Sequence, residues 1–362
     1  MQRYLTNGGP MHTALAVFLT LFTLQSFAQS NQEKLESISS LKRIAFGSCS
    51  NDEDPQPLWK DITAQQPDLW IWGGDNIYAD WGKSEAVEAA YKRQNAVPDY
   101  MALKDQTPII GTWDDHDYAF NNAGGNVSFK KISQKLHLDF MDVPLNSPRR
   151  QQEGIYTSYN FGPAGQRVKI LILDNRYFKN LEADAPLLGE KQWEWLENEL
   201  KNSTAQLHFF VAGLSVFSPT IPYTEEWWHY PGEVNRLQKL LSDYKIQAPV
   251  FLTGDKHFAS IFKYWGQLEF MSSGMTHTAP RKTWWYLARK YPLVYFGLSY
   301  GVIDIDWEES IPKLTMRIRD GRKDIFTRKV IWKNNTWEFT NRLIGPRVIV
   351  DENAPTDDEE HE

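Results

Sequence analysis

The sequence predicts an α/β domain, in which short buried strands alternate with amphipathic helices. Hydrophobic residues make up 41% of the 362-residue chain and aromatic residues 14%, which is enough apolar surface for one large core. Short apolar runs, typical of buried strands, recur up to about Leu268 and are separated by stretches of helical periodicity. Several of these runs end directly in a polar cluster.

The expected elements follow one another with few interruptions. In order they are strand 41–46, helix 57–65, strand 68–72, helix 84–94, strand 108–113, helix 129–141, strands 155–161 and 168–173, helix 189–202, strand 207–212, helix 233–244 and strand 249–252. The strands are nearly continuous apolar runs, as parallel strands buried on both faces require. The helices repeat apolar residues three and four positions apart, as at Trp193, Leu196 and Leu200.

The C-terminal third has a different pattern. Segments 300–307, 314–319 and 324–332 alternate apolar and polar residues, which is typical of half-buried antiparallel strands. Asp320-Gly321, between the last two segments, is a hairpin signature. We therefore expect one domain over residues 41–345, with a second, more antiparallel sheet formed by its C-terminal third.

The net charge of −7 is concentrated at the C-terminus. The last twelve residues contain no lysine or arginine and seven acids: Asp351, Glu352, Asp357, Asp358, Glu359, Glu360 and Glu362. The other acidic side chains balance the 39 lysines and arginines, so the body of the protein has no basic surface for nucleic acid. We expect residues 346–362 to be an acidic, disordered tail.

The N-terminus has the pattern of an export signal. An apolar run from Met11 to Ala28 has the length of a signal-peptide core and ends in small residues, as signal peptidase requires. It is too short for a transmembrane span, and no second apolar stretch of that length follows. We expect a signal peptide at 1–28, a linker at 29–40, and an exported protein that is periplasmic or secreted. An N-terminal anchor is the alternative.

Cys49 is the single cysteine of the chain, so it cannot form an internal disulfide. The usual role of a lone cysteine is that of a small buried hydrophobic residue. The alternative is a thiolate held by a metal, which would protect it in an oxidising compartment. Its position directly after a predicted strand bears on this choice.

Residues that can bind metals follow several predicted strands. In open α/β sheets, ligands bind outside the carboxyl ends of the strands. Those ends carry Cys49, Asp75, Asp114, Asp115, His116, Asp174, Arg176, Asp255 and His257. So many carboxylates in one crevice would repel one another unless cations neutralise them. The residues therefore predict a centre of two or more metals, which suits in-line displacement at phosphorus.

Five segments carry a resemblance to a known family: Gly47-Ser48-Cys49, Gly74-Asp75-Asn76-Ile77-Tyr78, Thr112-Trp113-Asp114-Asp115-His116-Asp117, Leu173-Asp174-Asn175-Arg176-Tyr177 and Thr253-Gly254-Asp255-Lys256-His257. In this order the sequence resembles the alkaline phosphatase D (PhoD-like) family, within the calcineurin-like metallophosphatase superfamily. The resemblance runs from about Leu41 to Trp332. It implies a sandwich of two mixed β-sheets flanked by α-helices. It also implies a centre of Fe³⁺ and Ca²⁺, with other divalent metals as alternatives.

The resemblance also implies roles for individual residues. The implied metal ligands are Cys49, Asp75 as the carboxylate between metals, Tyr78 as a phenolate, Asp115 with Asp114 as its substitute, Asp255 and His257. His116 would be the general acid that protonates the leaving group, with Asp117 or Asp114 orienting its ring. Arg176 would clamp the phosphate, and its alternative is a salt bridge to Asp174. For Tyr78 the alternative is a core aromatic.

The implied activity is metal-dependent hydrolysis of phosphoric esters, in which a metal-bound hydroxide attacks phosphorus in line. Small-molecule or polymer phosphate esters would be the substrates. One alternative is a phosphodiesterase or phospholipase acting on lipid head groups or wall polymers. Another is a non-catalytic protein that binds metal or phosphate. No glycine-rich nucleotide loop is present, which argues against a kinase or dehydrogenase.

Two further histidines have no assigned role. Trp228 and His229 stand where the family resemblance leads us to expect smaller or acidic residues, so they bear on specificity. His277 is either a polar group at the rim of the site or part of a surface turn. The oligomeric state and the natural substrate do not follow from these patterns.

Overall fold

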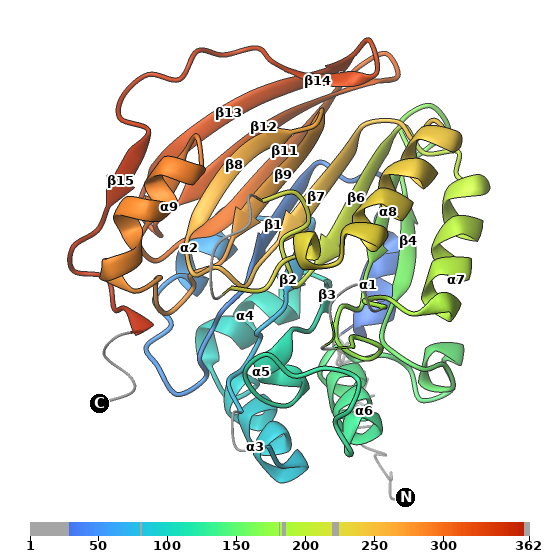
Figure 1. Ribbon diagram of the computed structural model, residues 1–362, viewed down its shortest axis with the longest axis vertical. Helices are drawn as coiled ribbons and strands as arrows, with labels where there is room; N and C mark the ends of the chain where they lie inside the picture. Colours follow the sequence, from blue (N-terminus) through green and yellow to red (C-terminus); the bar gives the residue numbers. More distant parts are fainter. Residues whose placement is uncertain (1–28, 80–81, 181, 183–185, 219–223, 358–362) are drawn as a thin grey trace, which may run out of the picture.

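Two mixed β-sheets pack face to face in this computed structural model, which describes residues 29–79, 82–180, 182, 186–218 and 224–357 (Figure 1). The seven-stranded sheet has the order β14 (Thr336–Phe339), β13 (Asp324–Lys333), β12 (Ile311–Arg319), β11 (Tyr300–Glu308), β1 (Arg43–Gly47), β2 (Leu69–Gly73), β3 (Ile109–Thr112). The eight-stranded sheet has the order β15 (Val348–Val350), β10 (Val294–Phe296), β8 (Ala259–Tyr264), β9 (Gln267–Ser272), β7 (Pro249–Thr253), β6 (Leu207–Ala212), β5 (Val168–Ile172), β4 (Thr157–Phe161).

Most helices flank the two sheets on their outer faces (Figure 1). The helices are α1 (Asn31–Ser37), α2 (Trp59–Ala64), α3 (Ser84–Gln94), α4 (Pro98–Gln106), α5 (Asp115–Tyr118), α6 (Lys130–Phe140), α7 (Glu190–Lys201), α8 (Pro231–Asp243) and α9 (Trp284–Lys290). Of these, α1 contributes Leu35 to the core between the sheets. Short 3₁₀ helices are η1 (Pro148–Arg150), η2 (Trp227–His229) and η3 (Arg281–Thr283). None of the described helices is long and apolar enough to cross a membrane.

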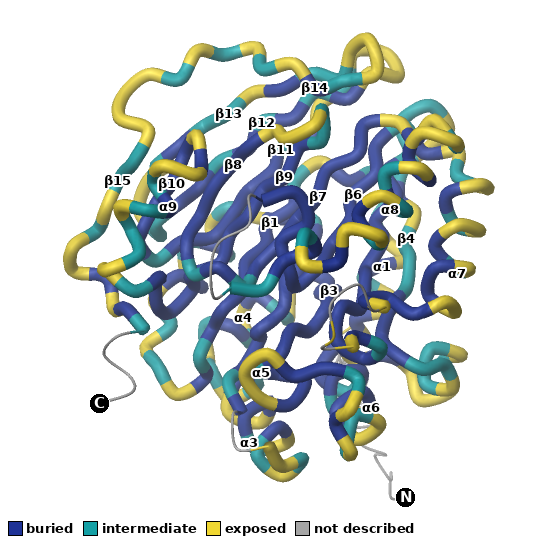
Figure 2. Tube along the Cα trace, viewed as in Figure 1, coloured by how far each residue is buried: buried dark blue, intermediate teal, exposed yellow. Residues whose placement is uncertain are grey.

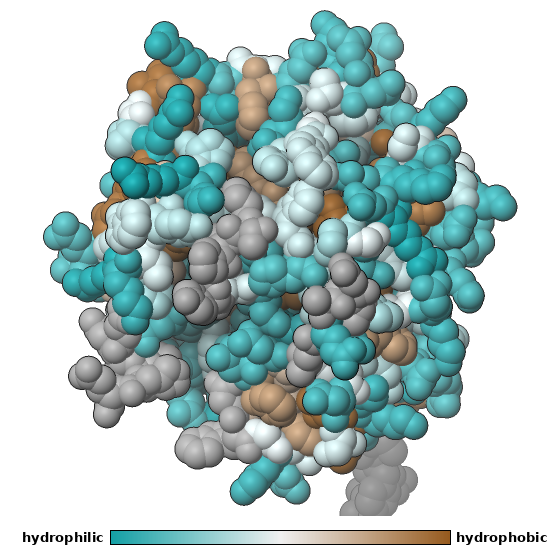
Figure 3. Space-filling view, viewed as in Figure 1, coloured by the Kyte–Doolittle hydropathy of each residue, from teal (hydrophilic) through white to brown (hydrophobic). Residues whose placement is uncertain are grey.

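The strands are apolar on both faces because both faces are covered. On β1, Ile44 and Phe46 enter the core between the sheets, whereas Ala45 faces the layer of α2, α3, α4 and α6. The ring of Phe46 packs in a T-shaped contact on the ring of Phe270, which belongs to the other sheet, and their centroids lie 4.8 Å apart. Figure 2 shows this buried centre in dark blue, and the face in Figure 3 is mostly hydrophilic. The predicted sandwich of two mixed sheets flanked by helices is therefore confirmed.

The C-terminal strands do not form a sheet of their own, contrary to our expectation. β11 pairs antiparallel with β1, with Ile44 opposite Ile303, so β11 to β14 extend the sheet that β1, β2 and β3 begin. The physical reason is that β1 has two open edges, and β2 covers only one of them. The hairpin at Asp320-Gly321 is present, because β12 pairs antiparallel with β13 and Gly321 has a φ of +84°.

Residues 31–37 of the expected linker are instead the helix α1. Ser30 and Glu33 form a capping box at its start. The side-chain amide of Asn31 donates to the carbonyl oxygens of Ile109 (2.7 Å) and Met141 (3.1 Å). Leu35 is buried in the core between the sheets. Because the segment is mostly polar, its pattern did not indicate that Asn31 and Leu35 would attach it to the rest of the fold. The expected signal peptide, 1–28, lies outside the described residues.

Much of the expected acidic tail is also folded. Val348–Val350 forms β15, which pairs in parallel with β10 through Val294 and Val348. Thr278 forms a β-bridge with Thr356, and the Asp357 carboxylate lies 2.6 Å from Nδ1 of His257. The charge count overlooked the β-branched Val-Ile-Val run before the acids. Residues 358–362 lie outside the described part of the chain.

We expect stability to fall in acid through the buried His208 of β6. Burial lowers the pKa of this imidazole to about 4, while its ring bonds the Ser203 hydroxyl and the Gln247 carbonyl at 2.7 Å each. The unfolded chain takes up the proton at a pKa of about 6.5, so this stability is present above about pH 6.5 and is lost as the pH falls toward 4.

The measurement is urea unfolding of the wild type and of His208→Gln at about pH 7.5 and about pH 5. Between those values the wild type should lose about 2 kcal/mol more of its free energy of unfolding than the variant. Equal losses in the two proteins would contradict this assignment.

Candidate metal centre

The chain turns that follow four strands meet at one end of the sandwich, where the sequence predicted a site. Cys49 follows β1, Asp75 follows β2, and the pair Asp114 and Asp115 follows β3 in the seven-stranded sheet. Asp255 and His257 follow β7 of the other sheet. β1, β2 and β3 are parallel neighbours, so their carboxyl ends lie at the same end of their sheet. The carboxyl end of β7 lies at the same end of the sandwich, and these side chains therefore come together.

Several of these residues adopt a strained backbone conformation. Cys49, Asp75, Asp255 and His257 have φ values of +58°, +49°, +72° and +56°, a region that disfavours residues other than glycine. Such conformations cost about 1–3 kcal/mol each and persist where the surroundings hold them for a function. Neighbouring glycines allow the close approach: a Cβ on Gly213 would lie 2.5 Å from Cγ of Asp114.

One group of ligand atoms is of mixed chemistry. Sγ of Cys49, a carboxylate oxygen of Asp75 and a ring nitrogen of His257 all lie within 4.8 Å of one another. The Cys49 thiol donates to Oδ2 of Asp75 at 3.4 Å. The hydroxyl of Tyr78 lies 3.2 Å from Nε2 of His257 and 3.1 Å from Nε2 of His277. Tyr78 therefore points its phenol into this group, and does not serve only as a core aromatic.

The second group consists of carboxylates. Ligand oxygens of Asp114, Asp115 and Asp255 lie within 4.8 Å of one another, and those of Asp75 and Asp115 do so with a nitrogen of His116. Oδ2 of Asp114 and Oδ1 of Asp115 are buried and accept no hydrogen bond. Buried carboxylate oxygens are expensive without a partner. Asp75 belongs both to the mixed group and to the group with Asp115 and His116, and Asp115 in turn belongs to the group with Asp114 and Asp255. The site therefore has the donors for two cations side by side.

The electrostatics of the cluster show the cost of holding it without cations. Burial, followed by the charges of Cys49 and Asp115, raises the pKa of Asp75 well above its usual value. Burial likewise raises the pKa of Asp255 to about 6. Asp115 differs: burial opposes its ionisation, but the charges of Arg176 and His116 and the backbone N–H of Asn122 together outweigh burial and lower its pKa. Cations bound here would remove the repulsion, which is how metal sites stabilise clustered carboxylates.

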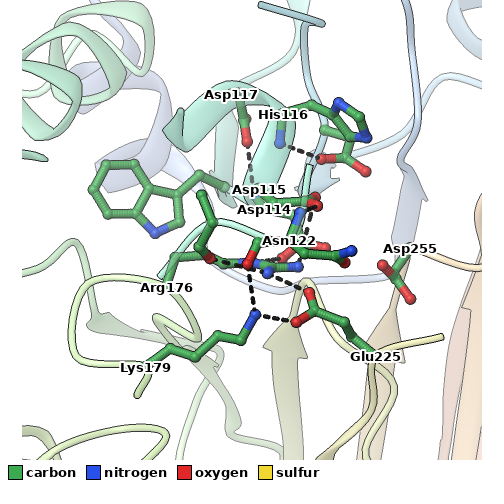
Figure 4. Close-up of polar contacts among 12 residues, drawn as sticks. Asp114, Asp115, His116, Asp117, Asn122, Arg176, Lys179, Glu225 and Asp255 are labelled. Atoms are coloured by element: carbon green, nitrogen blue, oxygen red, sulfur yellow. Dashed lines mark hydrogen bonds and ion pairs between the residues drawn. The ribbon is translucent and has the colours of Figure 1, made fainter. Parts of the chain in front are cut away.

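Arg176 lies inside the cluster with its guanidinium fully buried (Figure 4). Its Nε donates to Oδ1 of Asp114 at 2.5 Å, and Nη1 donates to Oε2 of Glu225 at 2.5 Å. Lys179 also binds the Glu225 carboxylate. The alternative salt bridge with Asp174 is not formed, since the Asp174 carboxylate accepts the backbone N–H of Arg176 at 2.9 Å.

His116 and Asp117 are neighbours at the start of α5, but their side chains have different partners. The ring of His116 stacks on Tyr78 with centroids 4.2 Å apart, and its backbone N–H donates to Oδ1 of Asp75 at 3.3 Å. The Asp117 carboxylate accepts the backbone N–H of Asp114 at 2.6 Å (Figure 4). It also accepts the side-chain amide of Asn76 at 2.6 Å. It therefore holds the two loops, and we correct its expected role of orienting the His116 ring. Asp114, paired with Arg176, does not take that role either.

Four residues of the site were not assigned from the sequence: His277, Asp357, Glu225 and Lys179. His277 is buried against Tyr78, so its segment is not a surface turn. It follows β9, the parallel neighbour of β7, and the rule of strand ends would have found it. Asp357 lies in the expected acidic tail, and no sequence pattern indicated that it would reach the site. His229 is not among them: its half-exposed ring lies 3.5 Å from Glu226.

A pocket of about 510 Å³ opens beside Asp255 and His257. Its polar wall includes Asn122, Glu225 and Asp357. Its opposite wall is apolar and comes from Phe258, Ala279, Pro280, Trp285, Tyr286 and Leu287. The buried cluster thus has an approach with room for the ester group of a substrate and for part of its alcohol.

Comparisons with known proteins agree with this geometry. Alkaline phosphatase D from Bacillus subtilis (strain 168) is 23% identical over 268 residues, which is 59% of this chain and 45% of that protein. The chain thus spans about half the length of this curated relative. A solved structure of PhoD matches with a TM-score of 0.68 and 16% identity, over 88% of this chain and 74% of that one.

More distant solved structures share the fold. A dimetal phosphatase from Danio rerio has a TM-score of 0.50 and 12% identity, over 81% of this chain and 100% of that one. GAP50, the anchor in the inner membrane complex of Plasmodium, has a TM-score of 0.54 and 12% identity, over 82% and 90%. The model of the PhoD-like phosphatase family matches residues 44–284. With this match over most of the chain, and the strand-end cluster in place, the protein belongs to the PhoD-like phosphatase family.

Proposed function

We propose that this protein is a metal-dependent phosphoric ester hydrolase. The observation that carries the proposal is the pair of ligand groups that share Asp75, next to a pocket that Asp255 and His257 line and that is large enough for an ester. A binding protein would not need two such groups side by side with a buried arginine and a histidine. Membership of a phosphatase family supports the same activity.

The donor sets fit two different cations. Cys49, Tyr78, His257 and Asp75 offer thiolate, phenolate, imidazole and carboxylate, which suit a transition metal, and we propose Fe³⁺. Asp75, Asp115 and Asp255, with Asp114 beside them, offer oxygens only, which suit Ca²⁺ or another hard divalent cation. Burial and the charge of Cys49 raise the pKa of Tyr78 well above its usual value, so its phenolate form requires a cation. When bound, such metals supply a nucleophile at neutral pH and charge for the phosphoryl oxygens.

The protein residues would position the ester and move its proton. Nη2 of Arg176 forms no hydrogen bond and is ion-paired with Oδ1 of Asp115 at 3.5 Å, so it could donate to a phosphoryl oxygen bound beside Asp115. Glu225 holds the Nη1 position and would yield it to an anionic substrate. His116, stacked on Tyr78 beside Asp75, would protonate the leaving alcohol.

The pocket favours phosphodiesters as a second class of substrate. Its apolar wall, formed in part by Phe258 and Leu287, extends beyond Asp255 and can receive an ester substituent larger than a hydroxyl. The second organic group of a diester, in addition to the leaving alcohol, could lie against that wall. We also propose export to the periplasm or the medium, supported by the apolar run at residues 11–28.

Elemental analysis combined with visible absorption tests the metal assignment. We expect iron and calcium in the purified protein, and a charge-transfer colour from Tyr78. Cys49→Ser should lose iron, because a hydroxyl is a poorer ligand than a thiolate. Tyr78→Phe should lose the colour.

Tyr91→Phe is the matched control, since Tyr91 is buried and bonds Asp117 at 3.4 Å but lies outside both ligand groups. It should keep both metal and colour. Full iron content in Cys49→Ser, or a Tyr78→Phe protein as coloured as the wild type, would refute these ligand roles.

A further inference from the structure

The segment Arg281–Lys290, formed by η3 and α9, is both cationic and aromatic. Ten consecutive residues contain four cations, no acid and three aromatic rings. The cations are Arg281, Lys282, Arg289 and Lys290, and all four side chains are exposed. This contrasts with a chain whose net charge is −7. We name this segment the basic helix.

Trp285 is the most unusual residue of the basic helix, because 63% of its surface is exposed to solvent. Arg289 lies four residues after Trp285 in α9, so the two side chains share one face of that helix. The guanidinium of Arg289 lies 5.7 Å from the Trp285 ring. An exposed indole flanked by cations is the pattern of helices that lie at a lipid–water interface.

The inner face of the basic helix is firmly docked, which fixes the outward direction of Trp285. Leu287 is buried, and the Trp284 ring stacks on Phe296 with centroids 5.1 Å apart. The Trp284 indole N–H donates to the carbonyl oxygen of Ala279 at 2.7 Å. Figure 1 shows α9 over the end of the eight-stranded sheet that carries β8 and β15. The exposed indole is therefore a built feature of the surface.

We propose that the basic helix binds anionic lipid surfaces, with Trp285 inserted at the head-group level and the cations on the lipid phosphates. Trp285 and Lys282 also line the pocket that leads to Asp255 and His257. A membrane bound here would therefore lie at the entrance of the candidate metal centre. The binding itself does not depend on the proposed hydrolysis, so the two proposals can fail separately.

The cations of the basic helix favour an anionic lipid over a neutral one. The exposed indole of Trp285 favours a lipid surface over a soluble polyanion, because it can insert among the head groups. Each lysine or arginine near an anionic membrane contributes about a fivefold gain in partition. On one side the basic helix meets the C-terminal segment, where Arg281 donates to the carbonyl oxygen of Glu352 at 2.8 Å. Arg289 and Lys290 lie at the other end of α9, and are the residues to alter.

The test is co-sedimentation of the whole chain with vesicles of phosphatidylcholine, alone or with about one third phosphatidylglycerol. We expect binding to the mixed vesicles only, and its loss in about 1 M salt, where charges are screened. Arg289→Gln/Lys290→Gln should lower the partition coefficient about 25-fold, and Trp285→Ala about tenfold. The N-terminal apolar run is common to all variants and cancels in these comparisons.

Trp265→Ala is the matched control. Trp265 is also exposed, at 55%, but lies in the turn between β8 and β9, where it packs on Trp228 at 4.7 Å. It should bind vesicles like the wild type. The proposal is wrong if Trp265→Ala and Trp285→Ala weaken binding equally, or if neutral vesicles bind as well. It is also wrong if only the charge variant loses binding, because Trp285 then takes no part in binding the lipid surface.

Discussion

Asp75→Asn is expected to lose both metals and to lower turnover of a phosphate ester by at least about 10³-fold. Asp75 is the residue that the two ligand groups share, with one oxygen bonded by the Cys49 thiol and the other by the backbone N–H of His116. A side-chain amide keeps the shape of the carboxylate but carries no negative charge and offers one oxygen instead of two.

The same variant should make the metal-free protein more stable. The pKa of Asp75 is raised in the folded state, so an ionised Asp75 destabilises the fold increasingly as the pH rises through that pKa. Asparagine removes this cost. The melting temperature of Asp75→Asn after chelation should therefore exceed that of the chelated wild type at about pH 8, while added metal should no longer raise it.

Asp174→Asn is the matched control for Asp75→Asn. Asp174 is also fully buried at a strand end, but its Oδ1 accepts the Trp113 indole N–H at 2.9 Å and it belongs to neither ligand group. It should lose stability and keep its metals. If Asp75→Asn retains wild-type metal content and turnover, Asp75 does not join the two sites.

His116→Ala is expected to lower turnover by about 10²–10⁴-fold while the metals stay bound. The ring of His116 stacks on Tyr78 at 4.2 Å, beside both ligand groups, where it can reach a leaving oxygen. Protonation matters most for a poor leaving group. The loss should therefore be large for an alkyl ester and small for a nitrophenyl ester.

Metal content separates this role from the alternative, since a nitrogen of His116 also lies within ligand distance of Asp75 and Asp115. If His116→Ala loses a metal, the ring is a ligand. If the loss in turnover is the same for alkyl and nitrophenyl esters, it is not the acid. His229→Ala, in the half-exposed η2, is the control and should leave both quantities unchanged.

Patterns of apolar residues predicted most of the α/β elements well. Helix 84–94 and strand 207–212 have the predicted bounds, and most others differ by a few residues at each end. Segments whose burial depends on distant partners were missed. α1 is held by Asn31, which bonds β3 and the end of α6, and β15 exists because β10 offers it an edge. A local pattern contains no information about such partners.

For the site, the chain itself determined which residues occupy the strand ends. The rule that ligands bind at the carboxyl ends of strands depends only on element order, so it brought out Cys49, Asp75, Asp115, Asp255 and His257 without coordinates. The same rule brought out His116, and the family resemblance added Tyr78 and the expected role of His116 as general acid.

The tertiary structure decided how these residues pair. Asp117 does not orient the His116 ring and instead accepts the backbone N–H of Asp114. Arg176 bonds Asp114 and Glu225. Asp357 bonds His257, which lies a hundred residues earlier in the sequence. Side-chain partners are set by packing of segments distant in sequence, and the energy of each pair depends on burial that only the assembled fold creates. Element order therefore determined which residues reach the site, and packing decided what each one contacts.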